Sequence, residues 1–155
     1  MENFEKLVQR CVDNDENHTI FNASLSHAAI LFENLLDVAD KKKEDVRIFS
    51  GCFEKEFYES LKGKVVKLLN SGVKVHLVSD CEKKDLEENE FIKTVSDHKN
   101  GTIKNLSEQK GIPHFILVGD SRYRVELDDS LKTARANFND SSTGNMLLGL
   151  YNKLR

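Results

Sequence analysis

The clearest pattern in the chain is a stripe of apolar side chains at helical spacing. The stripe comprises Leu25, Ala28, Ala29, Phe32, Leu35, Leu36 and Ala39. Residues at this spacing share one face of an α-helix, so we expect a helix here with one buried face. Ser24 or Ser26 can cap its start, and Lys41-Lys42-Lys43 falls where positive charge favours a helix end. A shorter helix is expected over residues 3–12, followed by a polar loop.

A strand, a helix and a second strand follow with short connections. Residues 46–51 are expected to form a strand that stops at Gly51, residues 54–69 have helical periodicity, and residues 73–80 alternate between apolar and polar. This order is a βαβ unit, so the two strands should be parallel. The charged segment that follows predicts a helix over residues 85–98 with Asp85 as its cap, and then a short strand from Thr102.

Three more strands are expected in the last third of the chain. Residues 114–118 are apolar, Gly119-Asp120 is a turn signal, and residues 123–127 alternate. Residues 133–139 give the third strand, and a helix capped by Ser141 or Ser142 follows, with Gly149 marking a close approach to the sheet. Together these elements predict a single α/β domain in which helices sandwich a mixed β-sheet.

The strand that begins at His114 resembles the C-terminal half of a phospholipase D-like domain. The motif of these HKD-type phosphodiesterases reads H-x-K-x-x-x-x-D, followed by G-S-x-N. His114 stands at the histidine position, Ile116 at the lysine position and Ser121 at the aspartate position, with Asp120 one step early. G-S-x-N aligns with residues 134–137, where only the asparagine is kept. The motif is therefore degenerate.

The resemblance implies a site in which the histidine attacks a phosphodiester while lysine and asparagine neutralise the phosphoryl oxygens. Losing a preorganised cation from such a site removes much of its transition-state stabilisation, and Ile116 makes the pocket drier. The candidate catalytic residue is His114. The candidate ligand-binding residues, two of which could restore positive charge, are Lys132, Arg135, Asn137 and Asn139. Ordinary structural roles remain open for the histidine, the arginine and the asparagines, which often satisfy backbone groups.

The resemblance leads to two functional hypotheses. The first is a catalytically degenerate phospholipase D-like module that binds a protein partner or a phosphate-bearing ligand, such as nucleic acid, without cleaving it. The alternative is an active phosphodiesterase or nuclease that uses His114 with Arg135 or Lys132 as a non-standard cation. The family builds its active centre where two halves meet, so we expect a homodimer with its two-fold interface near His114. Family analogy also suggests an interaction subunit of a defence-type complex.

Composition and net charge indicate the cellular environment in which the protein is expected. The resemblance covers residues 24–155, so residues 1–23 are expected to be an N-terminal helix and linker. The chain of 155 residues has a formal net charge of −3, which gives no global basic field to attract nucleic acid. The sequence shows no signal peptide or membrane span, and Cys11, Cys52 and Cys81 form no C-x-x-C pair. We therefore expect a cytoplasmic protein with reduced thiols, no metal site and no cofactor.

Overall fold

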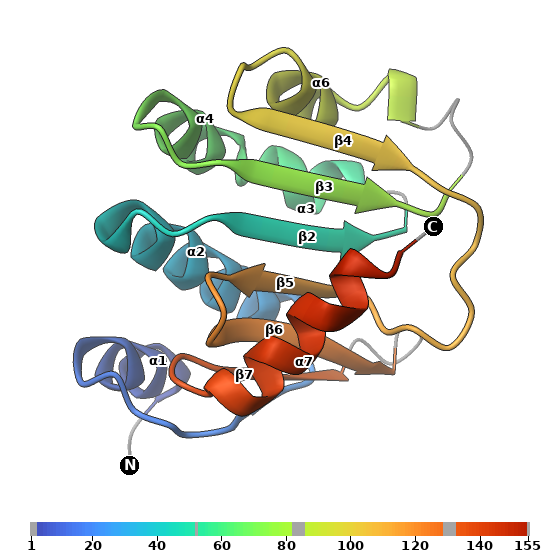
Figure 1. Ribbon diagram of the computed structural model, residues 1–155. Coiled ribbons are helices and arrows are strands. Elements are labelled where there is room, and N and C mark those ends of the chain that lie inside the picture. The colour runs from blue at the N-terminus through green and yellow to red at the C-terminus, as the bar shows by residue number, and fades with distance from the viewer. Residues whose placement is uncertain (1–2, 52, 82–85, 129–132, 155) are drawn as a thin grey trace.

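The computed structural model describes residues 3–154 except 52, 82–85 and 129–132. These residues form a seven-stranded mixed sheet in the order β1-β7-β6-β5-β2-β3-β4, with helices on both faces (Figure 1). The strands are β1 (Ile20–Asn22), β2 (Val46–Ser50), β3 (Val75–Ser79), β4 (Gly101–Asn105), β5 (Phe115–Val118), β6 (Arg122–Asp128) and β7 (Thr133–Asn137). The predicted α/β architecture with a mixed sheet between helices is confirmed.

The sheet has a parallel part and an antiparallel part that meet at β2. β2, β3 and β4 run parallel, whereas β5 pairs antiparallel with the other side of β2. The antiparallel part continues through β6 and β7 to β1. The predicted βαβ unit is present, but α3 (Lys55–Glu59) and α4 (Lys62–Asn70) replace the single helix expected there. The Ser60 hydroxyl donates to the Phe57 carbonyl (2.6 Å), a bond that competes with continuation of one helix.

The helices divide unequally between the two faces of the sheet. α1 (Phe4–Asp13), α2 (Leu25–Lys42), α3, α4 and α6 (Glu90–Ser96) cover one face, and α7 (Ser141–Asn152) crosses the other (Figure 1). The larger core lies under the first group and includes Leu31, Leu35, Ile48, Leu77 and Ile116. The smaller core lies under α7 and includes Phe49, Phe115, Leu117, Tyr123 and Leu147. Alternation along each strand sends neighbouring side chains into different cores.

The N-terminal segment contributes a strand to the sheet and a helix to one of its faces. β1 pairs antiparallel with β7, with Ile20 opposite Ala136. α1 packs against α2, and both Val8 and Cys11 are fully buried in the larger core. β1 was not predicted from the sequence, because the strand is only three residues long and Phe21 on it is 68% exposed.

Local side-chain interactions set several helix starts. Ser24 caps α2, as one of the two expected candidates, by accepting a hydrogen bond from the His27 N–H (3.2 Å). Asp140, and not Ser141 or Ser142, caps α7 by accepting from the Thr143 N–H (3.2 Å), since its carboxylate precedes both serines. α6 begins at Glu90, later than expected, and the expected cap Asp85 lies outside the described residues.

The close approach of α7 to the sheet occurs at Gly144. A Cβ there would overlap the backbone of Asp120, whereas a Cβ at Gly149 would meet no atom within 4 Å. The expectation for Gly149 is therefore wrong, because that residue faces away from the sheet contact. None of the helices in the described part of the chain is long and apolar enough to cross a membrane.

Candidate functional site

His114 lies at the edge of the sheet where parallel strands β2 and β3 end. Gly51 follows β2, and a Cβ at Gly51 would lie 3.5 Å from His114 Cε1. Asp80 follows β3 directly. In open α/β sheets, ligands bind outside the carboxyl ends of the strands, where the connections diverge to different sides. β2 is such a strand, because it has β3 on one side and β5 on the other.

Both ring nitrogens of His114 face carboxylates. Nε2 lies 3.4 Å from Asp80 Oδ1, and Nδ1 lies 3.8 Å from Glu126 Oε2. The Gln109 N–H donates to Asp80 Oδ2 (3.1 Å), which orients that carboxylate, and the Phe49 ring packs edge-on against the imidazole. The His114 side chain is 25% exposed and that of Asp80 is 9% exposed. The imidazole is thus held between two acids at the surface of the pocket.

Arg124 is the buried cation of this site. It is 5% exposed, and its Nη1 lies 3.8 Å from Glu126 Oε1. Its Nε donates to Asn22 Oδ1 (3.3 Å), and its guanidinium lies 5.7 Å from the centroid of the Phe32 ring. Burial lowers the pKa of Arg124 from its ordinary value, and the neighbouring Glu126 partly opposes this effect. The charge of Arg124 is therefore already engaged within the protein.

A cavity of about 320 Å³ opens beside His114. Its apolar wall is made by side chains from α2, α3 and the segment after β2, namely Leu25, Ala28, Phe32, Phe53, Phe57 and Tyr58. Its polar end carries His114, Arg124, Glu126 and Glu54. Burial raises the pKa of Tyr58, so its phenol stays neutral at physiological pH. The pocket is therefore largely aromatic, and its polar end holds more carboxylates than permanent cations.

Ile116 occupies the position at which the phospholipase D-like motif has lysine. It lies two residues after His114 and is 0% exposed in the core beneath α2. Its partner across the β5–β6 pair is Arg124. Because cross-strand partners point to the same face of a sheet, the buried cation lies on the strand next to the expected one.

The structure does not bring Arg135, Asn137 or Asn139 to His114. Arg135 is the register partner of Val125, which belongs to the α7 face, whereas His114 lines the cavity on the α2 face. Asn137 pairs with Tyr123 at the far end of β6, while Glu126 at the near end bonds to the His114 carbonyl (3.0 Å). Two residues of the segment that aligns with G-S-x-N, Arg135 and Asn137, therefore lie away from His114.

The two asparagines instead attach the N-terminal segment to β7. Asn137 is 1% exposed, and its Nδ2 donates to Asn17 Oδ1 (2.8 Å). Asn139 donates to the Asp15 carbonyl (2.7 Å) through its side chain and to Asn137 Oδ1 (2.9 Å) through its backbone N–H. Lys132, the fourth candidate, lies outside the described residues.

Sequence reasoning did not identify Asp80, Arg124 and Glu126 as site residues. Alternation over residues 123–127 places Arg124 and Glu126 on the face opposite Tyr123 and Val125. Because this strand pairs with the buried strand that begins after His114, the two charged residues could have been predicted to lie near the histidine. Asp80 could have been recognised as the residue that directly follows the second parallel strand. Within the described ranges, no group of three His, Cys, Asp or Glu side chains is placed to hold a metal ion.

Comparison with solved structures identifies the fold as phospholipase D-like. NucT from Helicobacter pylori matches with a TM-score of 0.67 at 12% identity, over 88% of this chain and 94% of NucT. A polyphosphate kinase from Porphyromonas gingivalis matches with a TM-score of 0.58 at 11% identity, over 100% of this chain and 28% of the kinase. These likenesses establish the class of fold that the resemblance at His114 implied.

A third structure, TrmBL2, is an archaeal chromatin protein with a novel mode of DNA binding. It matches with a TM-score of 0.66 at 12% identity over 96% of this chain. The present chain spans 57% of the length of TrmBL2. No protein-family model matches the sequence, and no curated protein matches it.

Proposed function

We propose that this chain is a catalytically degenerate phospholipase D-like module that binds nucleic acid without cleaving it. The observation that carries the loss of catalysis is the pair of carboxylates on His114 combined with the buried Ile116 at the lysine position. Phosphoryl transfer is accelerated mainly by positioned positive charge around the transferred group. Here the charged side chains beside the two ring nitrogens are carboxylates.

The electrostatics of the pocket support the same conclusion. A phosphodiester entering the cavity would meet Glu126 and Glu54, while Arg124 is already paired with Glu126 and Asn22. Both ring nitrogens of His114 have a carboxylate oxygen as a neighbour, at 3.4 Å and 3.8 Å, so a phosphodiester that approaches either nitrogen meets negative charge. The cavity therefore suits neither a phosphodiester substrate nor the charge that develops on it.

Nucleic-acid binding is the part of the proposal that the comparisons support. TrmBL2, whose solved structure shows a mode of DNA binding, has the fold of this chain over 57% of its own length. The likeness is one of fold.

The decisive experiment for catalysis is a single-turnover assay with protein in excess over labelled single-stranded DNA, duplex DNA, RNA and a chromogenic phosphodiester. We expect no cleavage that depends on His114, so wild type and His114→Ala should both match the buffer. His18→Ala, which changes an exposed histidine in a loop, is the matched control. Cleavage by wild type and His18→Ala that is lost in His114→Ala would overturn the proposal.

One observation favours the alternative of an active phosphodiesterase. Arg124 is the cross-strand partner of Ile116, so a permanent cation lies next to the position of the missing lysine. In this alternative Arg124 takes the part foreseen for Arg135 or Lys132. Cleavage lost in both His114→Ala and Arg124→Met, but kept in His18→Ala, would establish it.

The proposed assembly is a homodimer that meets near the His114 end of the sheet. Phe21, Leu25 and Leu127 are exposed by 68%, 52% and 54%, respectively. Leu25 lines the His114 cavity, and Phe21 and Leu127 line a neighbouring apolar groove. A second copy covering this rim would bury all three side chains and bring the two His114 pockets together, as a two-fold contact requires.

A further inference from the structure

α7 leaves part of its face of the sheet uncovered. The helix crosses β5 and β6, and the strands β3 and β4 lie beyond it (Figure 1). A groove of about 260 Å³ lies over β2, β3 and β4 beside the end of α7. The side chains in it that bear on ligand binding are Arg47, His76, Thr102, Lys104 and Tyr151. This groove is on the opposite face of the sheet from the His114 cavity, because His76 alternates with the core residues Val75 and Leu77.

Register places the polar side chains of the groove on adjacent strands. Arg47 on β2 is the partner of His76 on β3, which in turn is the partner of Thr102 on β4. Lys104 lies two residues along β4 on the same face, opposite Val78. Neighbouring strands are roughly 4.8 Å apart, so Arg47 and Lys104 lie on either side of a narrow polar surface.

The groove is positively charged. Arg47 and Lys104 line it, and Lys74 is close enough to His76 to affect its charge. The carboxylate that acts on His76 is Asp45, whose Oδ2 is 4.0 Å from His76 Nε2 and whose side chain is 41% exposed. Two permanent cations therefore line the groove, and Lys74 and the exposed Asp45 act on His76 beside it, in contrast to the acidic His114 pocket.

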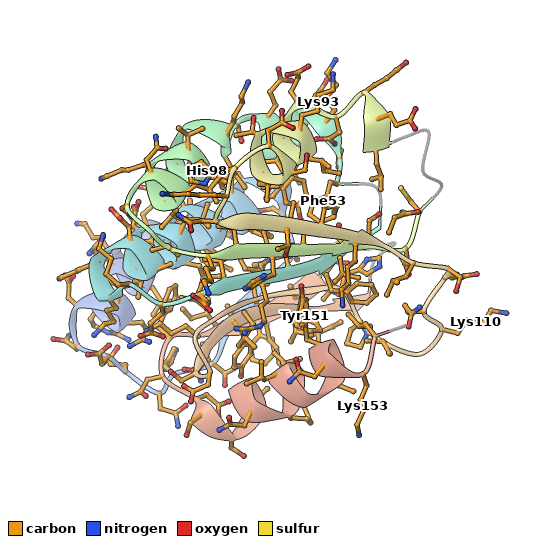
Figure 2. The ribbon with its side chains drawn as sticks, turned by 45° about the horizontal axis from the view of Figure 1, so that its top comes forward. Phe53, Lys93, His98, Lys110, Tyr151 and Lys153 are labelled. Atoms are coloured by element: carbon orange, nitrogen blue, oxygen red, sulfur yellow. The ribbon has the colours of Figure 1, made fainter. Side chains whose placement is uncertain are left out.

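Aromatic and planar groups lie beside these charges. The Arg47 guanidinium is 5.9 Å from the centroid of the Tyr151 ring, and Tyr151 lies between α7 and the sheet (Figure 2). His76 Nδ1 and Thr102 Oγ1 are 2.9 Å apart, which fixes the imidazole over the strands. Unpaired bases stack on aromatic rings and on arginine planes, whereas bases in a duplex are already stacked.

We propose that the groove over β2, β3 and β4 is a binding site for single-stranded nucleic acid, with Arg47 and Lys104 on the phosphates and the Arg47–Tyr151 pair against a base. This inference rests on the proposed nucleic-acid function and assigns that function to a face other than the His114 pocket. A positive groove with an adjacent stacking surface is the arrangement by which proteins bind single strands without sequence preference.

The test is fluorescence anisotropy with labelled oligothymidylate of about 20 nucleotides, which exceeds the roughly 4–16 nucleotides that comparable single-strand sites cover. Wild type is compared with Arg47→Ala/Lys104→Ala and with the control Lys93→Ala/Lys110→Ala. The control removes the same charge from residues that lie away from Tyr151 in Figure 2. Duplex DNA of the same length is the second probe, and thermal unfolding checks that each variant is folded.

We expect the groove variant to bind oligothymidylate at least tenfold more weakly than wild type at low salt, and the control to stay within about twofold. The slope of log affinity against log salt should fall by about 1.4 in the groove variant, since each phosphate contact on a single strand contributes about 0.7. Duplex DNA should bind more weakly than the single strand.

Other results would overturn the assignment in distinguishable ways. Binding by wild type that the control reduces as much as the groove variant would show nonspecific attraction and remove the site. Binding that His114→Ala or Arg124→Met reduces, but the groove variant does not, would place nucleic acid at the other face and keep the proposed function. The absence of binding by wild type to either probe would refute both the site and the nucleic-acid function.

Discussion

Arg124 lies directly across the β5–β6 pair from Ile116, so the cation of the His114 site comes from β6 and not from β5. The space that a lysine at residue 116 would need is taken by the core beneath α2, where Ile116 is fully buried. The isoleucine that replaces the lysine of the phospholipase D-like motif is therefore part of the hydrophobic core. Replacing Ile116 by lysine alone would place a charged side chain in this core.

Ile116→Lys should lower the free energy of unfolding by about 3 kcal/mol or more, because it buries an ammonium group without a partner. Ile116→Val is the matched control and should cost about 1 kcal/mol. Urea unfolding of both variants measures the difference. Equal stability of Ile116→Lys and wild type would show that the lysine reaches solvent or a carboxylate, and the pocket would then hold a second cation.

The Arg124–Glu126 pair should behave as a coupled unit. Arg124→Met leaves Glu126 beside a less polar side chain and should cost about 3 kcal/mol, whereas Arg124→Met/Glu126→Gln should cost less than the sum of the single changes. A double-mutant cycle in urea unfolding gives the coupling free energy. Additive costs would mean that the two side chains, 3.8 Å apart, act independently.

The cap of α7 should produce an acid-dependent loss of stability. The Tyr123 hydroxyl donates to Asp140 (2.7 Å), and this bond together with the Thr143 N–H holds the pKa of the Asp140 carboxyl below its ordinary value. As the pH falls, Asp140 is therefore protonated first in the unfolded chain. The stabilisation by the Asp140 carboxylate is complete above about pH 4 and is lost as the pH falls through the lower pKa of the folded state.

Asp140→Ala should cost about 1 kcal/mol at neutral pH, and the difference from wild type should shrink as the solution is acidified below about pH 4. Ser142→Ala, which changes an exposed residue of the same helix, should leave stability unchanged. Unfolding by urea across this pH range provides the measurement. A constant difference at all pH values would mean that the carboxylate charge does not contribute.

The apolar rim should control assembly. Leu127→Glu places a charge on the proposed two-fold contact and should shift the protein from dimer to monomer, with a dissociation constant raised at least tenfold. Met146→Glu is the matched control, because Met146 on α7 is also 54% exposed. Sedimentation equilibrium distinguishes the two variants. A wild-type protein that is monomeric at all concentrations would refute the proposed dimer.

Binding in the proposed groove should tighten at mildly acidic pH through His76. Burial lowers the pKa of His76, Arg47 and Lys74 lower it further, and Asp45 opposes them. The other polar groups facing the imidazole across the groove are Thr102, Lys104 and Tyr151. His76 is therefore neutral at pH 7, and it gains a positive charge as the pH falls below about 6.5 and through the lower folded pKa.

One added charge at a solvated site contributes about 1 kcal/mol, so the affinity for oligothymidylate should rise roughly fivefold once His76 is protonated. His76→Gln should remove this increase and leave the affinity at neutral pH within about twofold of wild type. Anisotropy titrations at a series of pH values test it. The same increase in wild type and His76→Gln would assign the effect to other groups.

The sequence predicted the architecture because its signals are local. The stripe from Leu25 to Ala39 and the βαβ unit depend on periodicity, which each segment shows by itself. The site was harder to predict, because it depends on which strands become neighbours. His114 was found from a motif, but the placement of Arg135 required the register of β7, which a short spacing in sequence does not determine.

β1 and β7 are neighbours in the sheet, although Ile20 and its partner Ala136 are far apart in the sequence. During synthesis β1 and the apolar side of α1 emerge long before Ala136, the partner of Ile20, exists. Contacts between residues far apart in sequence form more slowly than local ones, so we expect this pairing to form after the strands between them have assembled. Deleting either strand would expose the unpaired backbone groups of a new edge strand. Such an edge can pair with strands of other chains and promote aggregation.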